Sequence, residues 1–127
     1  MLTFLIDDDS DDQEIFSMAI KEMEPFAQCM FADDGVHALE KLASNDVMPD
    51  FIFIDINMPR MNGIQCLKEI KRVSKLEHVP VYMYSTAYEM YIVDECLKIG
   101  ATGFIKKEIH IKDLQKQLLQ IFMQQKI

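Results

Sequence analysis

The chain has 127 residues and is 50% hydrophobic, so it is the size of one domain that can bury its own core. Its 13 basic and 21 acidic residues give a net charge of −8. This charge disfavours DNA, RNA and anionic membranes, whose binding depends on clustered lysine and arginine. We therefore expect protein or cation partners, with no nucleic acid and no membrane among them.

The three cysteines, Cys29, Cys66 and Cys96, are widely spread and form no CxxC pair. They indicate neither a disulfide framework nor a zinc site. Residues 1–6 lack the basic flank and the long apolar core of a signal peptide. No apolar run approaches membrane-spanning length. We expect one cytoplasmic domain over residues 1–127.

Apolar runs of strand length alternate along the chain with longer segments in which apolar residues recur at helical spacing. This alternation is typical of repeated β-α units. The predicted strands are residues 2–7, 27–32, 50–55, 81–85 and 103–105. The helical patterns that follow them span residues 15–23, 36–43, 64–70, 88–99 and 111–122. Together they predict an α/β protein with a five-stranded parallel sheet and helices on both faces.

Local signals refine this prediction. Residues 51–54 are apolar at every position, as expected of a parallel strand that is covered on both faces, so this strand belongs in the middle of the sheet. Ser10 and Asp34 are predicted N-caps of the first and second helices. Gly100 is the predicted C-cap of the fourth helix.

Polar residues stand where the predicted strands end. Asp7 and Asp8 follow the first strand, Asp55 ends the third, Ser85 ends the fourth and Lys107 follows the fifth. Parallel strands joined by right-handed crossovers bring their carboxyl ends to one edge, where open α/β sheets bind ligands. With the strand order 2-1-3-4-5, these side chains converge on one pocket.

A pocket with three carboxylates needs a cation, because like unit charges about 4 Å apart repel by several kcal/mol at an effective dielectric constant of about 20. Mg²⁺ prefers hard oxygen ligands and keeps water or phosphate oxygens beside one or two carboxylates. We expect Asp8 and Asp55 to bind Mg²⁺ directly, with Asp7 in the outer coordination sphere. Asp55 could then act as a carboxylate nucleophile, while Lys107 offsets the remaining charge.

Four segments carry a resemblance to a known family. Residues 4–8 (FLIDD), 51–63 (FIFIDINMPRMNG), 80–87 (PVYMYSTA) and 100–107 (GATGFIKK) resemble response-regulator receiver domains in their order and spacing. The resemblance covers essentially the whole chain. It implies the flavodoxin-like receiver fold with strand order 2-1-3-4-5.

The resemblance also implies a role for each site residue. Asp55 is the phosphoacceptor, Asp7 and Asp8 are the acidic pair, and the backbone carbonyl of Asn57 is a further Mg²⁺ ligand. Ser85 is the switch hydroxyl, Lys107 is the site lysine and Phe104 is the switch aromatic. The chain departs from the family in having Glu108 where proline usually follows the lysine, and Phe104 where tyrosine is frequent.

The function expected from this resemblance is that of a phosphorelay switch. A sensor histidine kinase or a histidine phosphotransfer protein donates the phosphoryl group, and the signal leaves through a downstream protein target. A shift of Ser85 and Phe104 alters the face formed by the fourth helix, the fifth strand and the fifth helix. Phosphorylation-dependent homodimerisation is a further expectation to test. We expect no enzymatic turnover beyond autophosphorylation and slow autodephosphorylation.

Several alternatives stay open. A pseudo-receiver would keep the fold without phosphotransfer, and Glu108 leaves room for it. An aspartate-based phosphohydrolase would typically have a second aspartate at position 57, where this chain has asparagine. A flavin-binding module would need a Ser, Thr or Gly cradle after the first strand, where this chain has acids. Residues 7–12 taken alone are an acidic helix cap, and the exposed apolar residues of the fourth helix are either incidental or a docking surface.

Overall fold

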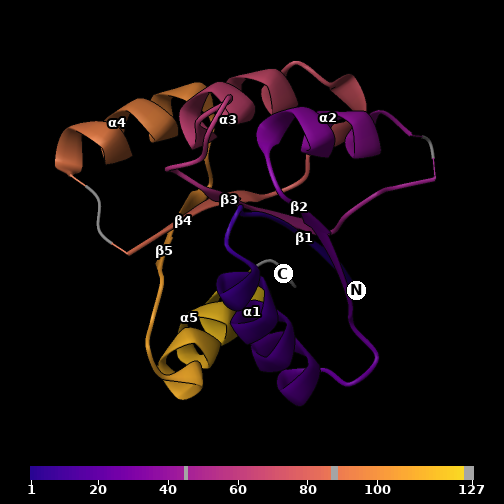
Figure 1. Cartoon of the computed structure of the whole chain (residues 1–127), viewed down its shortest axis with the longest axis vertical. Coiled ribbons are helices and arrows are strands. Elements are labelled where there is room, and N and C mark those ends of the chain that lie inside the picture. The colour runs from indigo at the N-terminus through magenta and orange to yellow at the C-terminus, as the bar shows by residue number, and fades with distance from the viewer. Residues whose placement is uncertain (45, 87–88, 125–127) are drawn as a thin grey trace.

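Five parallel strands form one sheet in the order β2-β1-β3-β4-β5, which confirms the predicted fold (Figure 1). The structure is a computed structural model that describes residues 1–44, 46–86 and 89–124. The strands are β1 (Leu2–Ile6), β2 (Gln28–Ala32), β3 (Phe51–Asp55), β4 (Val81–Ser85) and β5 (Gly103–Lys106). The helices are α1 (Ser10–Met23), α2 (Gly35–Ala43), α3 (Gly63–Lys71), the short 3₁₀ helix η1 (Ser74–Leu76), α4 (Met90–Ile99) and α5 (Ile111–Gln124).

The helices cover the sheet in two layers. Helices α1 and α5 lie on one face, and α2, α3 and α4 lie on the other (Figure 1). Each layer packs on its own apolar cluster, and β3 contributes to both because its side chains alternate between the two faces. Every residue of β3 is buried, as expected of the middle strand. Among the described residues, no helix is long and apolar enough to cross a membrane.

The strand register explains why the polar residues meet. Ile6 of β1 lies opposite Ile54 of β3, so the next residues, Asp7 and Asp55, stand at the same level. Asp55 in turn lies opposite Tyr84 of β4, which places Ser85 one step further along the same edge. All these residues therefore reach the carboxyl edge of the sheet within about one residue of one another.

Two predicted helix caps are confirmed and one is wrong. Asp34 caps α2 by accepting the amide of His37 at 2.8 Å, and Gly100 ends α4 with φ of 125°. Ser10 is not the cap of α1, because it is already the first helical residue. Asp9 has the extended backbone of a cap, and its carboxylate accepts the amides of Asp11 and Asp12.

The predicted boundaries of β4 match the structure, while those of the other strands shift by one residue. For example, the amide of Ala27 donates to the carbonyl of Glu24, so it closes a turn before β2 begins. Helix α4 begins at Met90, and the predicted start at Tyr88 lies outside the described residues.

On α4, Met90, Tyr91 and Leu97 are exposed while Cys96 is buried.

Candidate metal and phosphoacceptor site

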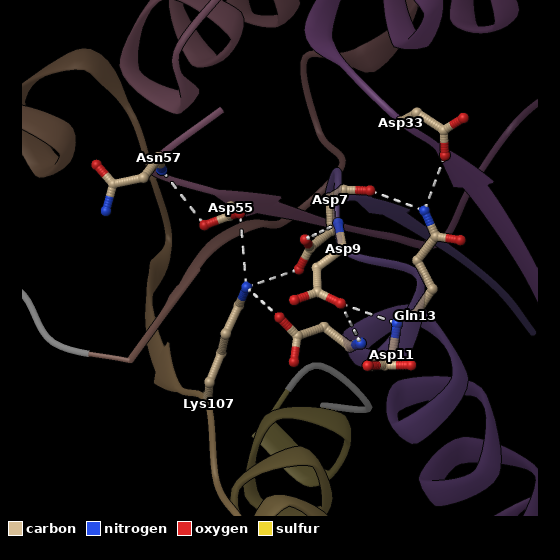
Figure 2. Close-up of polar contacts among 9 residues, drawn as sticks. Asp7, Asp9, Asp11, Gln13, Asp33, Asp55, Asn57 and Lys107 are labelled. Atoms are coloured by element: carbon tan, nitrogen blue, oxygen red, sulfur yellow. Dashed lines mark hydrogen bonds and ion pairs between the residues drawn. The ribbon is translucent and has the colours of Figure 1, made fainter. Parts of the chain in front are cut away.

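Three carboxylates meet at the carboxyl edge of the sheet. Oxygens from Asp7, Asp8 and Asp55 all lie within 4.8 Å of one another. Asp7 and Asp55 are buried, while Asp8 faces solvent. Two backbone amides fix the buried pair, since Asp9 donates to Oδ1 of Asp7 at 2.9 Å and Asn57 donates to Oδ1 of Asp55 at 3.3 Å (Figure 2).

Lys107 reaches into this cluster from the end of β5, as Figure 2 shows. Its Nζ lies 2.9 Å from Oδ2 of Asp7 and 3.5 Å from Oδ2 of Asp55. The backbone amide of Lys107 donates to the carbonyl of Ser85 at 2.8 Å, which ties the end of β5 to the end of β4. Glu108 in place of the usual proline therefore does not keep the lysine out of the site.

The charges in the cluster shift one another's protonation. Burial, together with the charge of Asp7, raises the pKa of Asp55 from its ordinary 3.8 to about 7. Burial likewise raises the pKa of Asp7, although Lys107 opposes this. Burial alone would lower the pKa of Lys107, but its close contacts with the carboxylates of Asp12 and Asp7 outweigh burial and raise the pKa. Without a further cation, the pocket therefore disfavours the ionised form of Asp55.

The donor set fits Mg²⁺. All three converging groups are hard carboxylate oxygens. Oδ2 of Asp7 is buried and, among the residues that the structure describes, has no partner with hydrogen-bond geometry beyond its ion pair with Lys107. Asp8 opens the cluster to solvent, so water ligands can be accommodated on that side. The backbone carbonyl of Asn57 remains a ligand predicted by family resemblance.

The two residues predicted to form the switch lie on neighbouring strands. Ser85 ends β4 and is buried. Phe104 on β5 lies opposite Met83, is half-buried, and packs against the apolar cluster beneath α2, α3 and α4. Ser85 therefore lies at the same edge of the sheet as Asp55, while Phe104 lies three residues before Lys107. Their switching roles remain predictions.

Comparisons with known proteins agree with this geometry. The family model described as "Response regulator receiver domain" matches residues 3–119. The chain belongs to this family. The chemotaxis protein CheY-3 of Vibrio cholerae is 33% identical over 122 residues, which cover 96% of this chain and 92% of that protein.

Solved structures give the same result for the receiver fold. The chemotaxis response regulator CheY4 of Vibrio cholerae has a TM-score of 0.83 at 26% identity, over 94% of this chain and 97% of that one. A CheX-CheY-BeF3-Mg complex from Borrelia burgdorferi gives a TM-score of 0.82 at 26% identity, over 96% of this chain and 89% of that one.

Sequence reasoning missed several contacts of this receiver site. Asp12, predicted as part of a solvated helix cap, accepts a hydrogen bond from Nζ of Lys107 at 2.7 Å. The ring of Tyr84 lies beneath the same ammonium group, whose nitrogen is 5.3 Å from the ring centroid. A carboxylate in the first turn of α1, five residues after Asp7, was the available signal for the Asp12 contact. Its partner on a distant loop gave no local signal.

A third missed contact, the ion pair of Arg60 with Asp34, stabilises the loop after β3. Arg60 has a positive φ of 64°, and the amide of Met61 donates across it to the carbonyl of Pro59 at 2.7 Å, as in a γ-turn. The guanidinium of Arg60 pairs with the buried carboxylate of Asp34, which also caps α2. This ion pair joins the loop that carries Asn57 to the start of α2.

The raised pKa of Asp55 predicts how the stability of the metal-free receiver depends on pH. The pKa of Asp55 is about 7 in the folded protein, above its ordinary 3.8, so the folded state binds this proton more tightly than the unfolded state. The proton therefore stabilises the fold fully below pH 3.8, and this stabilisation is lost as the pH rises through about 7. In chelator, we expect the free energy of unfolding to fall between about pH 5 and about pH 8. Urea denaturation at both pH values measures it.

The variant Asp55→Asn is the control for this pH dependence. It removes the titrating carboxylate and lessens the repulsion on Asp7, so the decline should become shallower. It should also be more stable than the wild type at the higher pH in chelator. An equally steep decline in this variant would contradict the assignment of the pH dependence to Asp55.

Proposed function

We propose that this receiver accepts a phosphoryl group on Asp55 from a phosphohistidine in a two-component phosphorelay, with Mg²⁺ as cofactor. The observation that carries the proposal is the convergence of Asp7, Asp8, Asp55 and Lys107 at one edge of the sheet. The donor would be a sensor histidine kinase or a histidine phosphotransfer protein. The matched complex from Borrelia burgdorferi, which contains Mg and BeF3, supports the choice of cofactor.

The residues have separate tasks in this transfer. Asp8, Asp55 and the carbonyl of Asn57 would hold the cation, with Asp7 one layer further out. Bound Mg²⁺ supplies positive charge that favours the ionised carboxylate and offsets the charge of the incoming phosphoryl group. A carboxylate oxygen of Asp55 forms the new bond to phosphorus as the bond from phosphorus to the donor nitrogen breaks. Lys107 neutralises negative charge on the transferred group.

The output follows from the position of the switch residues. In this proposal Ser85 moves toward the phosphoryl group and Phe104 fills the space it leaves, which alters the face formed by α4, β5 and α5. The exposed Met90, Tyr91 and Leu97 on α4 would belong to the surface that a downstream protein reads. In this proposal, phosphorylation also promotes homodimerisation.

Intact-protein mass after incubation with acetyl phosphate tests the proposal. We expect one phosphoryl adduct in Mg²⁺, none in chelator and none in Asp55→Asn, because the bond forms on that carboxylate. Asp46→Asn, which removes an exposed acid, is the matched control and should be modified like the wild type. Absence of an adduct in every condition would favour the pseudo-receiver instead.

A turnover assay separates this function from that of a phosphohydrolase. We propose that the chain turns over no external substrate, since its only phosphoryl chemistry is on its own Asp55. Steady-state hydrolysis of small phosphomonoesters should stay at the background rate, while the protein's own phosphate is lost slowly. Sustained turnover that depends on Asp55 would contradict this.

A further inference from the structure

The ammonium group of Lys107 is shared among three carboxylates, and the nearest of them is not the phosphoacceptor. Nζ lies 2.7 Å from Asp12, 2.9 Å from Asp7 and 3.5 Å from Asp55. The contact with Asp12 has hydrogen-bond geometry. The lysine side chain is only 11% exposed, against 26% for Asp12, so this ion pair is partly shielded from solvent. Lys107 is therefore held closer to Asp12 and Asp7 than to Asp55.

The position of Asp12 is fixed by its own helix. It lies in the first turn of α1, where its amide is close to the capping carboxylate of Asp9. Helix α1 packs along α5, on the same face of the sheet (Figure 1). The carboxylate of Asp12 thus approaches Lys107 from a packed element. Lys107 itself follows the end of β5, 95 positions later in the chain.

A contact made before phosphoryl transfer and weakened during it slows the transfer. A phosphoryl group on Asp55 adds negative charge at the carboxylate that, of these three, lies farthest from Nζ, at 3.5 Å. As that charge attracts the ammonium group, we expect the 2.7 Å contact with Asp12 to weaken. Only interactions that strengthen in the transition state accelerate a reaction, and the Asp12 contact works in the opposite direction.

We propose that Asp12 is a positioning residue that retains Lys107 in the unphosphorylated receiver and thereby slows phosphorylation. This inference rests on the proposed function, in which Asp55 takes up the phosphoryl group. Asp12 touches neither the donor nor phosphorus in this account, and acts only through the lysine. The rate of phosphorylation then depends on Asp12, which is not one of the three converging carboxylates Asp7, Asp8 and Asp55.

The rate of phosphorylation by acetyl phosphate in saturating Mg²⁺ tests the role of Asp12. We expect Asp12→Asn to raise the maximal rate about fivefold, as befits the loss of one partly shielded ion pair, with less change in the half-saturating donor concentration. Asp11→Asn is the matched control, because it removes the same charge from the same helical turn while Asp11 is exposed. It should stay within about twofold of the wild type. Asp12→Glu, which keeps the charge, should restore most of the restraint.

Equal rates in Asp12→Asn and Asp11→Asn would overturn the inference, as would a slower rate in Asp12→Asn. A wild type that takes up no phosphate would instead refute the proposed function. In that case, ¹³C relaxation of the Lys107 Cε in metal-free protein still decides whether Asp12 holds the lysine. The resonance is assigned with Lys107→Met. Greater mobility in Asp12→Asn than in Asp11→Asn is expected, and equal mobility would overturn the inference.

Discussion

Gly63→Ala is expected to lower the free energy of unfolding by about 3 kcal/mol and to impair phosphorylation. A Cβ atom at Gly63 would stand 2.3 Å from the backbone oxygen of Asp55 and 2.7 Å from Cα of Ile56. Both atoms belong to the backbone, so no side-chain rotation relieves the clash. The amide of Gly63 also donates to the carbonyl of Ile56 at 2.8 Å, which holds the start of α3 against this segment.

Gly35→Ala is the matched control for this prediction. Gly35 and Gly63 are both buried and both are the first residue of a helix. The three heavy atoms nearest to a Cβ at Gly35 all belong to the side chain of Met61, with Sδ at 2.7 Å, Cγ at 3.0 Å and Cβ at 3.2 Å. Another rotamer of the flexible methionine moves Sδ and Cγ away, and the Cβ contact needs a shift of only a few tenths of an ångström. We expect a change below about 1 kcal/mol, because alanine also favours the helix.

Urea denaturation of both variants, together with the mass assay for the phosphoryl adduct, measures these effects. The displacement should reach Asp55 itself, because the clash falls on its backbone carbonyl. A Gly63→Ala protein as stable as Gly35→Ala, and phosphorylated as fast, would show that the loop after β3 moves without affecting Asp55.

The fold could be predicted because apolar runs of strand length alternate with segments of helical periodicity, as in repeated β-α units. The unbroken apolar run of β3 belongs to a strand that is covered on both faces, and the structure buries all of it. Polar residues at four strand ends then had to share one edge once the strands were parallel. With the strand order 2-1-3-4-5, which the family resemblance implied, the proximity of Asp7, Asp8, Asp55 and Lys107 followed.

The remaining features depend on side-chain geometry that a linear pattern does not specify. Asp9 and Ser10 are both good N-caps, and only the backbone angles at Asp9 select it. The contact of Asp12 with Lys107 joins the first turn of α1 to the loop after β5, 95 positions later in the chain. Arg60, which pairs with Asp34, has a positive φ that arginine seldom adopts. The residue types at these positions allow the contacts, but they do not select the partners.

Lys107→Met should have opposite effects on the stability of the metal-free receiver and on its affinity for Mg²⁺. Methionine keeps an unbranched apolar chain of similar length above Tyr84, but removes the charge between Asp7, Asp12 and Asp55. Breaking a buried ion pair leaves its partners uncompensated, so we expect a loss of about 3 kcal/mol at pH 8 in chelator. The loss should shrink toward pH 5, because the pKa of Asp55 is already about 7 with the lysine present and rises further without it.

Mg²⁺ should bind more tightly to Lys107→Met than to the wild type, since the ammonium group no longer competes for the same carboxylates. Phosphorylation should nevertheless slow by about a hundredfold, because charge stabilisation of the transferred group is lost. Calorimetric titration with Mg²⁺ and the acetyl phosphate assay measure the two effects. Lys106→Met, which removes an exposed charge from the preceding residue, should change neither. If Lys107→Met bound Mg²⁺ more weakly than the wild type, the cation would have to sit away from the carboxylates that Lys107 contacts.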